Sequence, residues 1–289
     1  MTAPQNAKTL QRTCPICNTP NGPERPAKWG RDGWSAIECR ACGFVHMATV
    51  PATEALVETY AWEKTFEAEA KRRKTKHPIF AWLDGKTRWR LHLFRRSEGI
   101  EVLNKRASPG PALDLGCGSG GAFRGFANHL VPHGIEISQA LAAKASETAA
   151  ARGGQVVQAS SADGLMQFPD NYFTAALLRS YLEHDWQARD VVRNLFAKLT
   201  PGGVAVIKVP NYGSLNRRLM GARWCGFRFP DHVNYFDKAS LTRLARDAGF
   251  EVEIPFMRSL PTDDNMLALL IKPDAVSYTH LTLPTTVSV

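Results

Sequence analysis

Short apolar runs alternate with amphipathic stretches through the C-terminal two thirds of the chain. Apolar runs of strand length occur at residues 112–115, 131–137, 155–159, 174–179 and 204–209, and helix-like patterns at 122–130, 139–151, 188–199 and 240–248. Alternating strands and helices of this kind predict a doubly wound α/β fold, with helices on both faces of a parallel sheet. Two further runs, 251–257 and 266–272, predict a closing antiparallel hairpin.

A glycine-rich turn follows the first predicted strand, with the sequence PALDLGCGSGG at residues 111–121. Residues without a Cβ atom let the backbone approach a ligand closely, and the N-terminus of the next helix would offer free N–H donors. Gly116, Gly118 and Gly121 fit the G-x-G-x-x-G dinucleotide fingerprint, with Glu136 about 20 residues later to bind ribose hydroxyls. Asp114 argues otherwise, because an unpaired carboxylate in a buried strand is costly. The turn therefore predicts a cofactor site with a cation beside Asp114. The glycine spacing alone does not exclude a dinucleotide as the cofactor.

The turn resembles motif I of class I S-adenosylmethionine-dependent methyltransferases, in which the acid helps to hold the loop and the aminocarboxypropyl end of the cofactor. Leu-Glu-His at 182–184, LTPGG at 199–203 and the closing hairpin extend the resemblance, whereas Phe173-Thr174 departs from the family's common Phe-Asp. The resemblance implies a Rossmann-like seven-stranded methyltransferase sheet and S-adenosyl-L-methionine as the cofactor. The cofactor-binding residues that we assign are Asp114, Gly116, Cys117, Gly118, Gly120, Glu136, Ala162, Asp163 and Arg179.

Two histidines are the candidates for catalytic roles. His184 follows the fourth strand, at the sheet edge where open α/β folds bind ligands, and an imidazole titrates near neutral pH. We predict that one of His184 and His232 acts as a base while the other orients the substrate. The structural alternatives are a backbone hydrogen bond at a helix start for His184 and a loop-to-sheet contact for His232. For Asp163, capping a turn is as good an interpretation as a contact with the cofactor.

A long insertion rich in Asn, Arg, Tyr and Trp, residues 210–236, follows the fifth predicted strand. Its pattern resembles ribbon-bearing bacterial methyltransferases that are associated with cell-envelope sugar or secondary-metabolite pathways. The matching positions are Pro210, Asn211, Ser214, Trp224, Pro230, His232 and Phe236. We expect the substrate to contact Asn211, Tyr212, Arg217, Trp224 and Tyr235.

Four of the six cysteines form two C-x-x-C pairs, Cys14 with Cys17 and Cys39 with Cys42. Their spacing is close to that of a zinc ribbon, in which four thiolates hold one tetrahedral Zn²⁺. Four protein ligands close the site, so the predicted zinc is structural. The polar sequence between the pairs offers too little core to fold without metal. We assign residues 1–50 to this ribbon, with an architectural or substrate-lid role.

The formal net charge of +9 comes from one segment. Residues 71–106 hold 12 Lys or Arg against three acids, within a predicted basic helical connector or lid at residues 51–108. Such a segment is usually a solvated helix face, but it also suits RNA phosphates, and its interleaved Trp and Arg can stack on bases. The alternative function is therefore RNA methylation. The fourth strand lacks the Asp/Asn-Pro-Pro-aromatic signature of amino-directed nucleic-acid enzymes.

The sequence predicts that residues 109–275 form the S-adenosylmethionine-binding domain of an enzyme that methylates a small molecule. A sugar nucleotide or an envelope or secondary-metabolite intermediate is the expected acceptor. No run approaches the ~18 apolar residues of a membrane span, so we expect a cytoplasmic protein. The tail at 276–289 resembles translated sequencing-adapter read-through, and we predict that it is non-native. The acceptor atom and the oligomeric state are not predicted.

Overall fold

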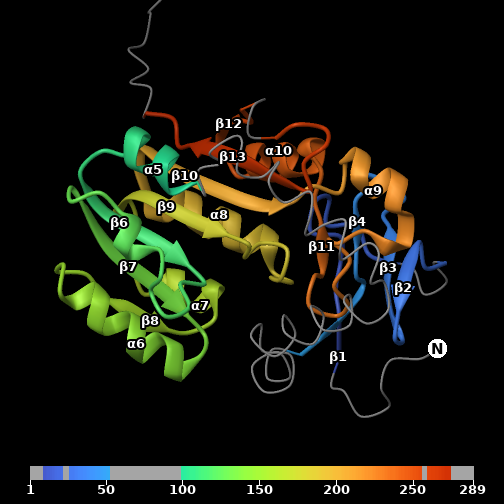
Figure 1. Cartoon of the computed structure of the whole chain (residues 1–289), viewed down its shortest axis with the longest axis horizontal. Helices are drawn as coiled ribbons and strands as arrows, with labels where there is room; N and C mark the ends of the chain where they lie inside the picture. The colour runs from blue at the N-terminus through green and yellow to red at the C-terminus, as the bar shows by residue number, and fades with distance from the viewer. Residues whose placement is uncertain (1–8, 22–25, 53–98, 256–258, 275–289) are drawn as a thin grey trace, which may run out of the picture.

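The computed structural model describes residues 9–21, 26–52, 99–255 and 259–274 (Figure 1). Residues 53–98, which hold most of the predicted connector and of the basic segment, lie outside the described residues, as does the predicted non-native tail. Within the described ranges, no helix combines the length and the apolar character needed to cross a membrane. The cytoplasmic location and the domain boundaries stay predictions.

Seven strands form the main sheet, in the order β12-β13-β10-β9-β6-β7-β8. The central strands β6, β7, β8, β9 and β10 are parallel to their neighbours in this group, whereas β13 runs antiparallel to β10 and to β12. The bounds are β6 Gly110–Leu115, β7 Leu130–Glu136, β8 Val156–Gln158, β9 Phe173–Arg179, β10 Leu199–Pro210, β12 Glu251–Glu253 and β13 Asn265–Ile271. The predicted α/β class, with its closing antiparallel strands, is confirmed.

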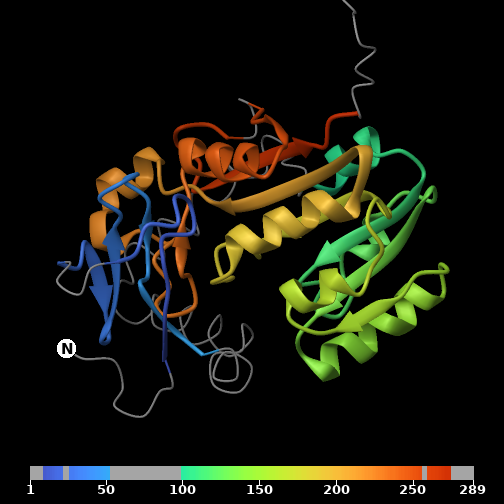
Figure 2. The same cartoon turned by 180° about the vertical axis from the view of Figure 1, so that it is seen from behind.

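Helices cover both faces of this sheet (Figure 1 and Figure 2). On one face, α7, α8 and α10 contribute Leu165, Val191 and Leu241 to the core, and on the other α5 and α6 contribute Leu103 and Ala145. The bounds are α5 Ile100–Arg106, α6 Gln139–Ala150, α7 Ser161–Met166, α8 Ala188–Lys198, α9 Leu215–Met220 and α10 Lys238–Asp247. The side chains of Ser138, Ser160, Ser214 and Asp237 cap the N-termini of α6, α7, α9 and α10, respectively.

The prediction of a helix over residues 122–130 is wrong. This segment contains one short 3₁₀ turn, η1 (Phe123–Gly125), before β7 begins. The carbonyl oxygens of Phe123, Phe126, Ala127 and Leu130 accept hydrogen bonds at 2.8–3.1 Å from the guanidinium of Arg152. Those of Phe123 and Ala127 also accept backbone hydrogen bonds from the residues three positions later, and no continuous α-helix forms. No helix N-terminus therefore follows the glycine-rich turn, and a ligand there would meet the backbone of the turn itself.

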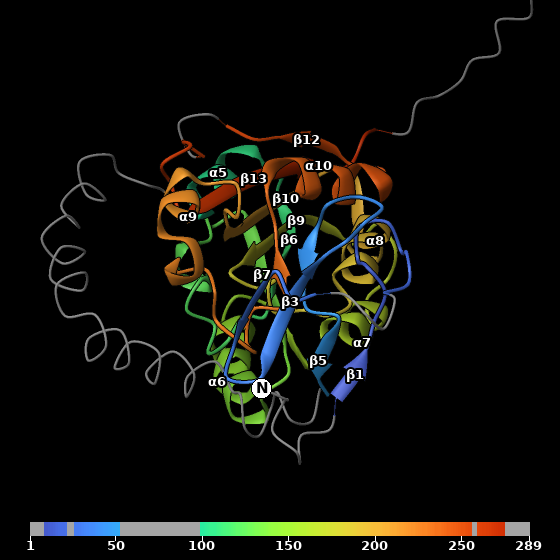
Figure 3. The ribbon, with the colours of Figure 1, turned by 90° about the vertical axis from the view of Figure 1, so that its right-hand side faces the viewer.

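The N-terminal ribbon, residues 9–52 as far as they are described, forms two small sheets. The first joins β1 (Thr9–Gln11) to β5 (Thr49–Pro51). The second has the order β11-β4-β3-β2 and consists of β2 (Trp29–Arg31), β3 (Trp34–Glu38), β4 (Val45–His46) and β11 (Asn234–Tyr235). Because β11 belongs to the insertion, the ribbon and the insertion share one sheet. Figure 3, seen from this end, shows the ribbon strands in front of the main sheet.

Arg12 fastens the ribbon to the rest of the chain. Its guanidinium donates hydrogen bonds to the carbonyl oxygens of Met47 at 2.8 Å, Trp186 at 3.0 Å and Val233 at 2.6 Å. Burial lowers the pKa of Arg12 to about 10, so the side chain stays charged at neutral pH. The ribbon is thereby held against the loop that follows β9 and against the insertion.

Candidate functional site

The glycine-rich turn lies at the carboxyl end of β6, beside the end of β7. Gly116 and Gly118 adopt positive φ angles of 71° and 55°, which favour glycine. The backbone N–H of Gly118 donates to Glu136 Oε2 at 2.8 Å, and that of Ser138 donates to Glu136 Oε1 at 2.9 Å. A Cβ atom on Gly118 would meet nothing within 4 Å. The turn is thus held in place by Glu136 and has open space above Gly118.

Asp114 lies two residues before Gly116, and its side chain is buried, with 5% of the residue exposed. Burial raises the pKa of its carboxyl to about 7, and the negative charge of Glu136 adds to the shift, whereas the positive charge of Arg179 opposes it. The cation that the sequence called for beside Asp114 is therefore Arg179, at the end of β9. Two carboxyl groups therefore lie near one guanidinium here, and the three groups together carry a net negative charge when Asp114 is ionised.

Tyr181 closes one side of the turn and was not among the predicted site residues. A Cβ atom on Gly116 would collide with the Tyr181 ring. The Tyr181 hydroxyl donates to Asp185 Oδ2 at 2.5 Å. The sequence signal was its position directly after β9, in the same stretch as His184. Tyr181 therefore fixes how closely a ligand can approach Gly116.

Asp163 lies in the first turn of α7, the helix that follows β8. The backbone N–H of Asp163 donates to Ser160 Oγ at 3.3 Å, and the Ser160 hydroxyl donates to Asp163 Oδ2 at 2.6 Å. The Asp163 side chain is exposed and Ala162 is half-buried. The capping contacts match the structural alternative for Asp163, and its contact with the cofactor stays a prediction.

The two candidate histidines lie side by side, with ring centroids 4.7 Å apart. His184 Nδ1 lies 3.0 Å from Asp231 Oδ1, and His232 Nδ1 lies 2.8 Å from the carbonyl oxygen of Gly226. Burial opposes the charged form of His184, but the Asp231 carboxylate outweighs it and raises the pKa. Burial lowers the pKa of His232 well below its ordinary value, and burial raises the pKa of Glu183 to about 7. Glu183 and Asp231 each directly precede a candidate histidine, a signal that the sequence analysis did not use.

The residues predicted to bind the substrate line the insertion, but most are buried. Trp224 and Tyr235 are 1% and 2% exposed, and they share a core with the ribbon residues Trp34 and Val45. Tyr212 belongs to the same core. These three aromatic side chains join the insertion to the ribbon, and their contact with an acceptor stays a prediction.

The two polar members of that set have local partners. The Arg217 guanidinium lies 4.3 Å from the Tyr212 ring centroid, and its Nε donates to the Tyr212 carbonyl oxygen at 2.7 Å. Asn211 Oδ1 accepts from the Gly213 N–H at 3.0 Å. Arg217 is half-buried and Asn211 is buried. Arg217 is therefore the more accessible of the two to a ligand.

The four paired cysteines converge in the ribbon. The sulfur atoms of Cys14 and Cys42 lie 3.6 Å apart, and those of Cys17 and Cys39 lie 3.5 Å apart. Thiolates at ~2.3 Å around a tetrahedral zinc ion are ~3.8 Å from one another. The cluster therefore has the dimensions of a four-cysteine zinc site. Arg189 of α8 donates to the carbonyl oxygens of Pro15 and Ile16, next to this cluster.

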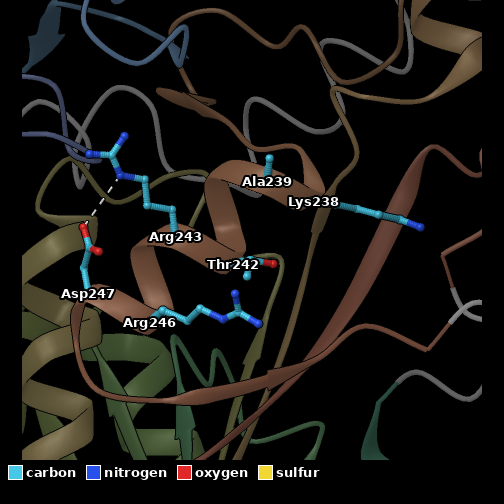
Figure 4. A pocket seen from close by; sticks show the side chains of 6 residues that line it. All are labelled: Lys238, Ala239, Thr242, Arg243, Arg246 and Asp247. Carbon is cyan, nitrogen blue, oxygen red and sulfur yellow. Dashed lines mark ion pairs between the residues drawn. The ribbon is translucent and has the colours of Figure 1, made fainter.

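A hollow on the surface of α10 lies outside the predicted site. Figure 4 shows that side chains of a single helix line it, among them Lys238, Thr242, Arg243 and Arg246. The Arg243 side chain reaches Asp247, at 3.9 Å. No predicted site residue borders the hollow, and nothing in its lining points to a ligand.

The sheet, the acidic glycine turn and the second carboxylate at the end of β7 define the α/β fold of the S-adenosylmethionine-dependent methyltransferases. A family model described as a methyltransferase domain matches residues 88–253, more than half of the chain. The chain belongs to this methyltransferase-domain family. No curated protein matches the chain.

Several solved structures are similar to part of the chain. The YcgJ protein of Bacillus subtilis shares 15% identity over 61% of this chain and 98% of its own, with a TM-score of 0.46. A possible histamine N-methyltransferase of Thermotoga maritima shares 20% identity over 66% and 96%, with a TM-score of 0.46. An S-adenosylmethionine-dependent methyltransferase of Archaeoglobus fulgidus shares 16% identity over 67% of this chain and 100% of its own, with a TM-score of 0.45. At TM-scores below 0.5, these likenesses add nothing to the family match.

Replacing Gly118 by Val is expected to weaken binding of S-adenosylmethionine by about 100-fold or more, equal to ~2.7 kcal/mol. A β-branched side chain is strained at φ 55° and fills the open space above the turn. Gly153→Val is the matched control, because Gly153 also has a positive φ, 76°, and open space, but it lies beyond the end of α6. Calorimetric titration measures both variants. Wild-type protein that binds NAD(H) and not S-adenosylmethionine would contradict the cofactor assignment.

The affinity for S-adenosylmethionine is expected to fall roughly tenfold between pH 8 and pH 6. With a pKa of about 7, Asp114 is mostly ionised at the higher pH and mostly neutral at the lower, so acidification removes a charge that attracts the cationic cofactor. The Asp114→Asn variant should bind S-adenosylmethionine weakly at both pH values, without the tenfold difference between them. Asp170→Asn, an exposed carboxylate paired with Lys198, should keep it. An unchanged pH dependence in Asp114→Asn would show that another group titrates.

Proposed function

We propose that the protein transfers the methyl group of S-adenosylmethionine to a small-molecule acceptor. The observation that carries this proposal is the pair of acids, Asp114 and Glu136, on either side of a glycine turn with open space above Gly118, in a member of the methyltransferase-domain family. The cofactor would supply an activated methyl group on a cationic sulfur, so the protein has chiefly to position an acceptor and exclude water.

The cofactor would lie along the carboxyl ends of β6 and β7. Asp114 and Arg179 suit its charged aminocarboxypropyl end, and Glu136 suits the ribose hydroxyls, in exchange for its present hydrogen bond to Gly118. Gly116, Cys117 and Gly120 provide the close backbone approach. Ala162 and Asp163 would lie beside the adenine.

The acceptor would lie beyond the end of β9, between the loop that carries His184 and the insertion. Both candidate histidines and the half-buried Arg217 belong to this side of the molecule. The ribbon packs against the same segments through Arg12 and through β11. It therefore suits a wall or lid over a small acceptor, such as a sugar nucleotide or an envelope or secondary-metabolite intermediate.

RNA methylation stays the second candidate function. The observation behind it is the basic excess of residues 71–106, most of which lies outside the described residues. Phosphate contacts by such a segment would make binding strongly dependent on salt. The described part of the chain gives this candidate no further support.

Purified protein incubated with methyl-labelled S-adenosylmethionine is expected to label a compound in a pool of sugar nucleotides and small metabolites. An RNA pool is tested in parallel, and Gly118→Val protein is the control with weakened cofactor binding. Label in RNA that disappears when Lys71, Arg72, Arg73 and Lys74 are replaced by Glu would reverse the choice of acceptor. Cofactor binding without label in either pool would contradict methyl transfer and indicate a protein that only binds the cofactor.

We also propose that Cys14, Cys17, Cys39 and Cys42 hold a structural Zn²⁺. The support is their sulfur spacing and two backbone hydrogen bonds that close the turns, from Asn18 to Cys14 at 2.8 Å and from Gly43 to Cys39 at 2.7 Å. Metal binding by such a small module is coupled to its folding. Because β11 pairs with β4, folding of the ribbon also orders the insertion.

Cys42→Ser is expected to lose one equivalent of zinc per chain relative to Cys225→Ser, whose exposed cysteine lies outside the cluster. Loss of this zinc should expose Trp34 and Trp224, which share the core of ribbon and insertion, and shift tryptophan fluorescence to longer wavelength. Elemental analysis and fluorescence measure the two effects. Equal zinc content in the two variants would remove the zinc assignment.

A further inference from the structure

Two histidines and a glutamate from separate segments converge beyond the end of β9. Glu183 and His184 belong to the loop that follows β9, and His232 belongs to the insertion. Their side-chain ligand atoms all lie within 4.8 Å of one another. We call these three residues the Glu–His–His cluster. It lies apart from the four cysteines of the ribbon, in sequence and in donor chemistry.

Hydrogen bonds orient both imidazole rings of the cluster. Nδ1 of His184 lies 3.0 Å from both Asp231 Oδ1 and the Asp231 carbonyl oxygen, and Nδ1 of His232 lies 2.8 Å from the Gly226 carbonyl oxygen. Since these partners accept hydrogen bonds, each Nδ1 carries the proton, and the lone pair of each neutral ring is on Nε2. A carboxylate or a carbonyl behind the ring is the usual support of a metal-binding histidine.

The cluster contains buried polar atoms that have no hydrogen-bond partner among the described residues. Glu183 Oε2 and His184 Nε2 are buried without a hydrogen-bond partner there, and Glu183 is 1% exposed. Glu183 Oε1 and His184 Nε2 are 3.9 Å apart, too far for a hydrogen bond. Arg228 pairs with Asp231, at 2.7 Å, and its positive charge also acts on Glu183 and on both histidines. Leaving such groups unsatisfied is costly, and His232 brings a third ligand atom within 4.8 Å of them.

We infer that the Glu–His–His cluster binds a divalent transition-metal ion through the Glu183 carboxylate and Nε2 of His184 and His232. Two imidazoles and a carboxylate are the donor set of borderline ions such as Zn²⁺, Co²⁺ and Fe²⁺. Tetrahedral ligands at ~2.1 Å from an ion lie ~3.4 Å apart. The 3.9 Å between Glu183 Oε1 and His184 Nε2 is close to this spacing.

Three protein ligands leave a coordination position open, as in catalytic metal sites. The cluster lies on the side where the acceptor is proposed to bind, and this step rests on the proposed function. The open position suits an oxygen atom of the acceptor, which makes a hydroxyl or enolate compound the expected substrate class. His184 and His232 then act as metal ligands and not as proton acceptors.

Co²⁺ distinguishes the two metal sites by absorption spectroscopy, because thiolates give intense sulfur-to-cobalt charge-transfer bands and nitrogen and oxygen ligands do not. Metal-depleted wild-type protein is titrated with Co²⁺ under anaerobic conditions. The expected result is two equivalents per chain, one with the charge-transfer bands and one with weak visible bands alone. Metal-depleted protein given one equivalent of Zn²⁺, which fills the four-thiolate site first, should still bind one equivalent of Co²⁺ in calorimetry.

The variants Glu183→Gln and His232→Gln are expected to lose the weak-band equivalent and to keep the thiolate equivalent, which also reports that the ribbon is folded. Asp231→Asn should weaken the weak-band equivalent by about 10- to 100-fold, because it removes the support of His184. His129→Gln, which removes an exposed histidine outside the cluster, is the matched control.

Wild-type protein that binds only the thiolate equivalent, or cluster variants that bind both equivalents as wild type does, would overturn the inference. Calorimetric binding of S-adenosylmethionine is measured on the same samples. Cofactor binding and acceptor labelling without a second metal equivalent would reject the metal site alone. Loss of cofactor binding in wild-type protein would instead reject the proposed function.

Discussion

The hydrogen bonds of Arg12 are the interaction on which the relative position of the ribbon, the loop after β9 and the insertion depends. One guanidinium holds the ribbon, the loop after β9 and the insertion through carbonyl oxygens that lie far apart in sequence. Two of these acceptors belong to Trp186, two residues after His184, and to Val233, one residue after His232. The mutual position of the two histidines therefore depends on a side chain only two residues before Cys14. Through this link the cysteine module supports the position of both histidines.

The sequence predicts the main sheet well because its strands follow local patterns. Consecutive apolar residues such as those of β9 are buried on both faces of a parallel sheet, and this requires no knowledge of the partner strands. The prediction fails where a distant residue decides. The segment at 122–130 has a helical spacing of apolar residues, but Arg152 binds its carbonyl oxygens. Likewise, nothing local shows that β11 pairs with β4.

The candidate site also combines residues that the local sequence reveals with residues whose role depends on distant parts of the chain. Glycines and the buried Asp114 stand out in the sequence because their backbone and charge requirements are local. The aromatic residues of the insertion are predicted from the sequence to contact the substrate, and nothing local shows that Trp224 also packs with Trp34 of the ribbon, 190 residues earlier. Glu183 and Asp231 could not be predicted as site residues, because an acid next to a histidine is common on a protein surface and only the fold shows that these two are buried.

The short segment from Tyr181 to Trp186 connects the two sides of the site. At one end the Tyr181 ring packs on Gly116, and at the other the Trp186 carbonyl oxygen is held by Arg12. Between them, the Glu183 carbonyl oxygen accepts backbone hydrogen bonds from the insertion. Six residues span at most about 20 Å, and the two ends are held by different parts of the chain, one beside the glycine turn and the other by Arg12. The ribbon therefore helps, through Arg12, to fix the segment that carries Glu183 and His184 relative to the glycine turn.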